Sequence, residues 1–176
     1  QLDEESLQQL KLVEKNSDQL SELITQLLDI ARSEEGQLEV NKQSFDLQDV
    51  FEPLKLKFEN WAFQKKIKFQ WIGTEKSVSL YSDKSLVEKM LSNLISNAIK
   101  FTPESGEILI SQEIKDGRLF IEVEDSGEGI KEADKALIFD RFYQADNQQG
   151  NKGGTGIGLS IVKEFSKLLG AEVKLS

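Results

Sequence analysis

Apolar residues recur at helical spacing between residues 87 and 98 of this chain. Residues in a helix advance by about 100° each, so one stripe collects Val87, Met90, Leu91, Leu94, Ile95 and Ala98. The stripe predicts an amphipathic helix with one face in a core. Asn93 and Asn97 lie four residues apart beside this stripe, with Lys100 next to them. Asparagine is a poor helix former, and the simplest explanation for two amides here is a hydrogen bond to a neighbouring loop.

A longer helical pattern covers residues 4–34. Its apolar seam has alternating spacings of three and four, at Leu10, Val13, Ser17, Leu20, Ile24, Leu27 and Ala31. This heptad spacing favours a helix of a bundle, although an ordinary amphipathic core helix remains open. Gly36 is a natural helix terminator. We therefore expect a helical appendage over residues 1–35 and a globular domain over residues 36–176.

The rest of the chain alternates between strand and helix patterns. Strands are predicted at residues 38–45, 67–72 and 77–81, and a helix that Asp46 caps lies between the first two. Ser82 or Asp83 caps the asparagine-bearing helix, which Thr102-Pro103 ends. A hairpin follows, with strands 107–114 and 118–124 joined at Asp116-Gly117. The last part predicts a short helix near 132–139, a polar loop at 144–153, a helix over 155–169 that Gly170 ends, and the start of a strand.

Composition narrows the chemistry available to the chain. Its 22 basic residues are scattered and outnumbered by 31 acidic ones, giving a net charge of −9, which argues against sequence-independent nucleic-acid binding. It has no histidine and no cysteine, which removes imidazole bases, thiolate nucleophiles and metal sites built on either residue. No apolar run approaches the roughly 20 residues of a membrane span. The pattern predicts a soluble protein.

Two glycine-rich segments could bring backbone close to a ligand. The segment Gly153-Gly-Thr-Gly-Ile-Gly158 leads directly into a helix, where backbone N–H groups can bind phosphate. The alternative is that these glycines form a flexible hinge. The segment lacks the preceding strand of a dinucleotide fold, and the chain has no P-loop motif. Asp125-Ser-Gly-Glu-Gly129 follows a strand and reads either as a plain turn or as a carboxylate that accepts a hydrogen bond from an adenine amino group.

The order of these motifs resembles the N, G1, F and G2 boxes of the ATP-binding domain of sensor histidine kinases. They read Asn93-Leu-Ile-Ser-Asn97-Ala-Ile-Lys100-Phe101-Thr102, then Asp125 to Gly129, then Phe139-Asp-Arg-Phe142-Tyr143, then Gly154-Thr-Gly156-Ile-Gly158-Leu159. The resemblance implies the Bergerat ATP-binding fold, an α/β (α+β) two-layer sandwich. Its mixed sheet is covered on one face by helices, and one long bundle-type helix precedes it.

The resemblance also implies roles for single residues, with ATP and Mg²⁺ as the ligands. Asn97 would ligate Mg²⁺, Asn93 would support it, and Lys100 would neutralise phosphate charge. Nucleotide contacts are further implied for Phe101, Phe142 and the phosphate-holding Gly154, Thr155, Gly156, Ile157, Gly158 and Leu159. Asp125 would read the adenine, in a pocket that Gly127, Gly129 and Ile130 shape. Residues 143–153 would form a lid.

The chain departs from the family pattern after Tyr143. Many relatives have an arginine there, whereas this chain has Gln144, leaving Arg141 or Lys152 as the candidate cation. We also expect the family's last strands to lie beyond Ser176. Residues 1–35 resemble the second helix of the family's dimerisation and phosphotransfer bundle. Since the helix with the phosphoacceptor histidine is missing, we expect Mg-ATP binding without autophosphorylation.

The predicted function is transfer of the γ-phosphoryl group of ATP to a histidine on a bundle helix outside this chain. The implied partners are that helix, a response regulator receiver domain and a second copy bound through the first helix, in the cytoplasmic part of a membrane-anchored sensor. One alternative is an ATP hydrolase of the same fold. Such relatives carry a glutamate base four residues before the magnesium asparagine, where this chain has Asn93, a poor base. The other is a non-catalytic adaptor.

Overall fold

The computed structural model describes residues 3–73, 77–145 and 155–175. The chain divides into two compact units, Gln1–Glu39 and Val40–Ser176. Within the part of the chain that the structure describes, no helix has the length and apolar character that a membrane span needs.

The first unit is built on a single helix, α1 (Glu4–Glu34). Asp3 caps its start by accepting a hydrogen bond from the Ser6 N–H at 2.8 Å. At its end, the Gly36 N–H donates to the Ser33 carbonyl and the Gln37 N–H to the Arg32 carbonyl, while Gly36 has φ +65°. This is a Schellman motif, which needs a left-handed residue at Gly36. Much of the heptad seam is exposed, including Leu10, Val13, Leu20, Ile24 and Leu27.

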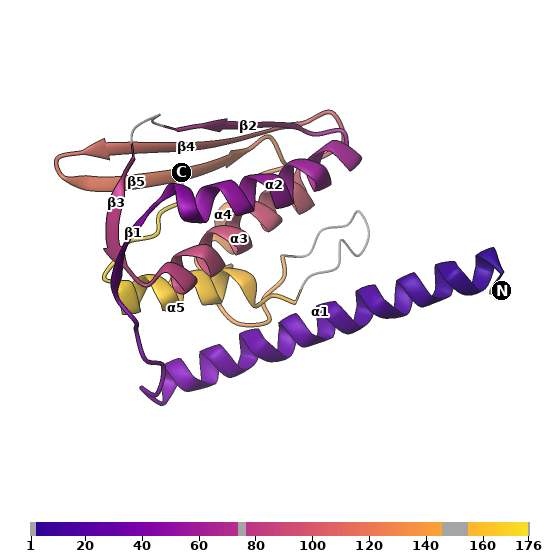
Figure 1. The fold of residues 1–176 in the computed structure, drawn as a ribbon, viewed down its shortest axis with the longest axis horizontal. Helices are drawn as coiled ribbons and strands as arrows, with labels where there is room; N and C mark the ends of the chain where they lie inside the picture. The colour runs from indigo at the N-terminus through magenta and orange to yellow at the C-terminus, as the bar shows by residue number, and fades with distance from the viewer. Residues whose placement is uncertain (1–2, 74–76, 146–154, 176) are drawn as a thin grey trace. The chain divides into compact units, whose positions relative to one another are not determined.

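The second unit contains two sheets (Figure 1). Strands β1 (Gln43–Asp46) and β3 (Ser79–Ser82) form an antiparallel pair. The larger sheet has the order β2-β4-β5, from β2 (Lys68–Ile72), β4 (Glu107–Lys115) and β5 (Arg118–Asp125). Strand β2 runs parallel to β4, and β4 runs antiparallel to β5. The predicted mixed sheet is therefore confirmed, as is the hairpin, whose turn residues Asp116 and Gly117 have φ +52° and +73°.

Helices α2 (Gln48–Gln64) and α3 (Lys84–Phe101) cover one face of the larger sheet, and α5 (Gly158–Leu169) packs beside α3 (Figure 1). A one-turn helix, α4 (Glu132–Lys135), follows β5. The predicted cap of α3 is present, since the Asp83 carboxylate accepts from the Leu86 N–H at 3.1 Å. The predicted stop at Thr102 and the glycine end of α5, with Gly170 at φ +70°, are confirmed too.

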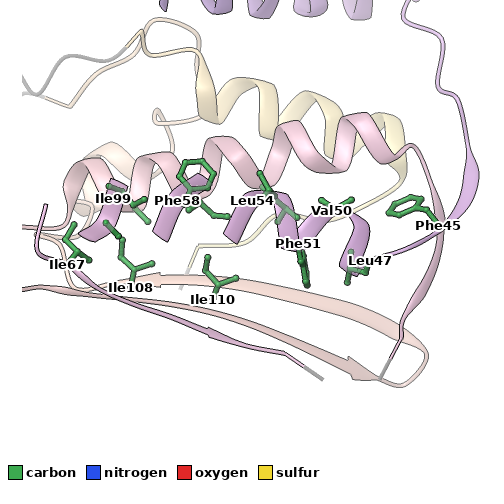
Figure 2. Close-up of a cluster of buried hydrophobic side chains, with 14 residues drawn as sticks. Phe45, Leu47, Val50, Phe51, Leu54, Phe58, Ile67, Ile99, Ile108 and Ile110 are labelled. Carbon is green, nitrogen blue, oxygen red and sulfur yellow. The ribbon is translucent and has the colours of Figure 1, made fainter. Parts of the chain in front are cut away.

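The core lies between these helices and the sheet (Figure 2). Phe51 and Phe58 of α2 and Ile99 of α3 belong to one cluster with Ile108 and Ile110 of β4, and all five are almost fully buried. Because side chains alternate along a strand, the intervening residues of β4 face the other side of the sheet. This packing fixes the position of α3 in the fold.

Two predictions at the start of this unit were wrong in detail. The strand expected over 38–45 is confined to Gln43–Asp46, because its partner β3 has only four residues. Before Gln43, the Asn41 N–H instead donates to the Asp83 carboxylate at 2.8 Å. The N-cap of α2 is Leu47 rather than Asp46, although the Asp46 carboxylate accepts from the Gln48 N–H at 3.0 Å.

Predictions for the last third of the chain also needed correction. The helix expected near 132–139 stops at Lys135, and short turns follow. The last helix begins at Gly158, because Thr155 to Ile157 are not helical and the Ile157 N–H donates to Thr155 Oγ1 instead. Residues 171–175 belong to no strand, since none of the described strands pairs with them.

The packing predicts a large difference between two phenylalanines of α2. Phe58 is 1% exposed, and Phe63 on the outer side of the same helix is 82% exposed. We expect Phe58→Ala to lower the free energy of unfolding by about 3–5 kcal/mol, through lost burial and a cavity. Phe63→Ala, the same chemical change, should lower it by less than about 1 kcal/mol. Urea unfolding measures both, and equal losses would contradict the packing described here.

Candidate functional site

The side chain of Asn93 lies between α3 and the start of α5. Its Nδ2 donates to the Lys89 carbonyl of the same helix at 2.8 Å, so this nitrogen bonds within α3 and not to a neighbouring loop. Its Oδ1 is turned toward α5, because a Cβ on Gly158 would lie only 2.8 Å from this oxygen. A side chain at position 158 would have to displace the amide. The structure thus brings together the first predicted asparagine and the last glycine of the 153–158 segment.

A second close contact joins Gly156 to the segment around Phe142. The Phe142 N–H donates to the Gly156 carbonyl at 2.8 Å, and a Cβ on Gly156 would lie 2.6 Å from the Phe142 carbonyl carbon. Gly156 has φ +67°. Phe142 also adopts a left-handed φ of +61°, and the residue is 64% exposed. The two backbones meet where glycine satisfies both the conformation and the space.

Two local hydrogen bonds hold the start of α5. Thr155 Oγ1 accepts from the Ile157 N–H at 3.2 Å, and the Ser160 hydroxyl donates to the Ile157 carbonyl at 2.7 Å. Ile157 is buried, which anchors the turn in the interior. The first N–H groups of α5 lack partners within the helix, which suits them to an anion. Gly154, Lys152 and most of the expected lid lie outside the described residues.

The turn after β5 contacts the C-terminal end of α3. The Asp125 carboxylate accepts from the Gly127 N–H at 2.8 Å, which is the local bond of a plain turn. A Cβ on Gly127 would lie 3.1 Å from the Phe101 carbonyl oxygen, so this turn also approaches the end of α3 closely. Gly129 has φ +70°, and Ile130 next to it is partly exposed. Ionised Asp125 retains further lone pairs for a ligand donor.

Helix α3 therefore spaces the two glycine motifs. Asn93, against Gly158, and Phe101, against Gly127, are eight residues apart, which is about 12 Å along a helix. Asn97 lies one turn after Asn93 and is half-buried. The arrangement places the glycine-rich start of α5 near one end of this flank and the turn that begins at Asp125 at the other.

Lys100 is the basic residue in the last turn of α3. It is half-buried, and its Nζ lies 5.0 Å from the centre of the Phe101 ring. Burial lowers the pKa of Lys100 below its ordinary value of 10.5, because desolvation penalises the charged ammonium. At neutral pH this charge costs folding free energy, and an anion beside it would recover that cost.

Lys65 also lies at this site, although no motif in the sequence predicted it. The Lys65 ammonium donates to three backbone carbonyls at the end of α3, although Lys65 precedes Ile99 by 34 residues.

Arg141, a candidate cation, is exposed. An open hollow of about 670 Å³ lies elsewhere, at the hairpin tip, and contains no predicted site residue; it is lined by Glu113, Lys115, Asp116, Arg118, Phe120 and Glu122.

These features define an α/β sandwich with an asparagine-bearing helix between two glycine motifs. Residues 82–176 match the family described as histidine kinase-, DNA gyrase B-, and HSP90-like ATPase, and the chain belongs to this family. It is 36% identical over 172 residues to the hybrid signal transduction histidine kinase D of Dictyostelium discoideum, covering 94% of this chain and 11% of that protein. The chain spans 11–19% of the length of the first three curated relatives, all of them histidine kinases.

Solved histidine kinases share the fold. Full-length ShkA in complex with AMPPNP is 27% identical, with a TM-score of 0.79, over 97% of this chain and 35% of that one. The histidine kinase ThkA in complex with the response regulator protein TrrA is also 27% identical, with a TM-score of 0.61, over 82% of this chain and 42% of that one. The expected Bergerat sandwich and the resemblance to sensor histidine kinases are confirmed.

The Gly156–Phe142 contact can be tested with a matched pair of alanine variants. Gly156 and Gly117 both have left-handed φ, but nothing lies within 4 Å of a Cβ on Gly117. Gly117→Ala should cost about 1–2 kcal/mol of folding free energy from the backbone alone. Gly156→Ala should cost more and also weaken ATP-analogue binding, because the added Cβ displaces Phe142. Equal stability losses with unchanged binding of the analogue would contradict the contact.

Lys100→Met tests the buried charge. We expect the nucleotide-free variant to be as stable as the parent or more stable at pH 7, since the desolvation cost disappears. This advantage should shrink as pH rises through the lowered pKa of the folded lysine toward 10.5, its ordinary value in the unfolded chain. ATP affinity should fall about tenfold and adenosine affinity much less, as the loss of one charge–phosphate interaction predicts. Thermal unfolding across pH and titration calorimetry provide the measurements; equal losses for both ligands would contradict a phosphate contact.

Proposed function

We propose that this chain binds Mg-ATP and is the catalytic domain of a sensor histidine kinase. The observation that carries the proposal is the contact of one helix with both glycine motifs, Asn93 against Gly158 and Phe101 against Gly127. ATP has an adenine at one end and phosphates at the other, and α3 offers groups suited to each at a spacing of about 12 Å.

In the proposed complex, the phosphates lie at the start of α5 and the adenine lies at the carboxylate turn. Gly154 to Leu159 hold the phosphates through backbone N–H groups, and Lys100 neutralises part of their charge. Asp125 accepts a hydrogen bond from the adenine amino group. Phe101 and Phe142 contact the nucleotide, and Gly127, Gly129 and Ile130 shape its adenine end.

Magnesium fits the residues present at this site. Its preferred ligands are oxygens, and it often takes one or two from protein and the rest from phosphates and water. Asn97, supported by Asn93, would supply the protein oxygen. In residues 3–73, 77–145 and 155–175, no three His, Cys, Asp or Glu side chains gather into a metal site, so the fit rests on the amide. When bound, the ion would neutralise charge on the phosphates.

The proposed reaction is phosphoryl transfer from ATP to a histidine nitrogen. The bond between the γ-phosphorus and the ADP oxygen breaks, a phosphorus–nitrogen bond forms, and ADP leaves. The acceptor is a histidine on another bundle helix, because this chain has no histidine. Positioning and charge stabilisation provide most of the catalysis in phosphoryl transfer, which amides, a lysine and a metal can supply.

The proposed partners follow from α1 and from the relatives. The exposed apolar seam of α1 would pack against the histidine-bearing helix and a second copy of the protein, since a single helix cannot bury such a seam. A response regulator is proposed as the downstream partner, by similarity to the ThkA complex. By similarity to relatives named sensor histidine kinases, we propose the cytoplasm as the location of this domain.

Binding of a fluorescent ATP analogue with and without Mg²⁺ tests the proposal. We expect Mg-dependent binding that Asn97→Ala and Asp125→Asn each weaken roughly 10- to 100-fold, as the loss of a charged hydrogen bond or metal ligand predicts. Asn60→Ala on α2 and Asp116→Asn at the hairpin turn are matched controls, and both positions are exposed. Asn97→Ala should remove the Mg²⁺ dependence, and Asp125→Asn should preserve it.

Two outcomes would contradict the proposal. Absence of nucleotide binding by the intact chain would favour an adaptor. Steady ATP hydrolysis by this chain, without transfer to an added pair of helices carrying the histidine, would favour a hydrolase. Acid-labile phosphate on the added helices, with none on this chain, is the result expected of a histidine kinase.

A further inference from the structure

The C-terminal end of α3 is held by an ammonium group from a distant part of the chain. Lys65 Nζ donates to the carbonyls of Ile99, Lys100 and Thr102 at 2.6, 2.9 and 2.7 Å. The last carbonyls of a helix have no partner within it and carry partial negative charge. One cation therefore satisfies three carbonyls of the turn that carries Lys100 and Phe101.

The position of Lys65 is itself fixed by the end of α2. It is the C-cap residue of that helix, and the next residue, Lys66, adopts a left-handed φ of +56°. The Lys66 N–H donates to the Phe63 carbonyl at 3.0 Å, and the Ile67 N–H to the Ala62 carbonyl at 2.9 Å. These two bonds form a Schellman motif. The lysine stem thus starts from an ordered turn.

Backbone hydrogen bonds join this turn to the loop after α3. The Ser105 N–H donates to the Lys66 carbonyl at 3.1 Å, and the Lys68 N–H donates to the Gly106 carbonyl at 2.9 Å. From there β2 and β4 run parallel, so the ends of α2 and α3 meet where both strands begin. Lys65 lies at a junction ordered on both sides, and its ammonium has little freedom to shift.

The Phe101 carbonyl has a different neighbour from the three beside it. Lys65 takes the carbonyls of residues 99, 100 and 102, whereas the Phe101 oxygen lies against Gly127, only 3.1 Å from where a Cβ would be. The turn that begins at Asp125 is packed against this oxygen. A shift of the last turn of α3 would therefore move Phe101, Lys100 and the carboxylate turn together.

We propose that Lys65 is a positioning residue for nucleotide binding: its ammonium fixes the last turn of α3, and so the placement of Lys100, Phe101 and the Asp125 turn. The inference rests on the proposed ATP site. A helix cap that served stability alone would lower the melting temperature without changing the affinity of the folded protein. A positioning residue changes affinity as well, since small displacements of binding groups are costly.

The test compares Lys65→Met with two controls in the full 176-residue chain. Methionine keeps an aliphatic stem and removes the ammonium. Val50→Ala on α2, in the core and remote from the α3 end, supplies destabilisation without touching the lysine. Lys66→Met removes the neighbouring charge, which is exposed and paired with Glu104. Melting temperature, dissociation constant for a fluorescent ATP analogue well below that temperature, and the amide resonances of Phe101 and Gly127 are measured for each.

We expect Lys65→Met to weaken analogue binding about tenfold and to shift the Phe101 and Gly127 amide resonances. Val50→Ala should melt at a reduced temperature and Lys66→Met near that of the parent, and both should bind within about twofold of the parent. Affinity of Lys65→Met equal to that of Val50→Ala, with unshifted resonances, would overturn the inference.

Two further results keep the test decisive. If Lys65→Met does not fold, Lys65→Gln, which is shorter and uncharged but can still donate, is judged by the same criteria. If the parent chain binds no ATP analogue, the proposed function fails. The resonances of Phe101 and Gly127 then decide whether Lys65 positions this turn: a shift in the Lys65 variant alone supports it, and no shift overturns it.

Discussion

The site depends on close contact between α3 and backbone that carries no Cβ. Gly158 lies against the Asn93 amide oxygen, and Gly127 lies against the Phe101 carbonyl, each at a distance that a side chain would occupy. Neither contact could form unless α3 were held firmly, and the core under Ile95 and Ile99 holds it. The sheet and α2 thus hold α3 in place, and the position of α3 sets the distance between the two glycine motifs.

Two lysines at the C-terminal end of α3 have different contacts. The Lys65 ammonium donates to the helix carbonyls and so compensates the negative end of the helix dipole. The Lys100 ammonium instead lies over the Phe101 ring, and burial lowers the pKa of Lys100. A protein optimised only for stability would gain little from a half-buried ammonium beside a cap that already satisfies the helix. The desolvation cost of the Lys100 charge is understandable if a phosphate lies beside it in the proposed complex, as is usual for groups at functional sites.

The sequence correctly predicted the features that depend only on residues close together in the chain. The Asp83 cap, the Asp116-Gly117 turn and the glycine helix ends need only nearby residues, and the order of motifs predicted the sandwich. Strand length was missed where a distant partner decides it, as β3 does for β1. Lys65 was missed for the same reason, because nothing near it in sequence shows that α3 ends beside it. The placement of the Asn93 oxygen against Gly158 likewise required the packed helices.

Position 93 is built for an amide rather than for an acid. The Asn93 nitrogen donates to the Lys89 carbonyl while the oxygen of the same group faces Gly158. An ionised carboxylate has no hydrogen to donate, so it could not make this bond to the Lys89 carbonyl. The difference between asparagine and glutamate therefore reaches beyond the lost general base. The amide at position 93 makes a bond within α3 that a carboxylate could not make, and it is also too weak a base to activate water for hydrolysis. Both properties support the proposed transfer to an external acceptor over hydrolysis.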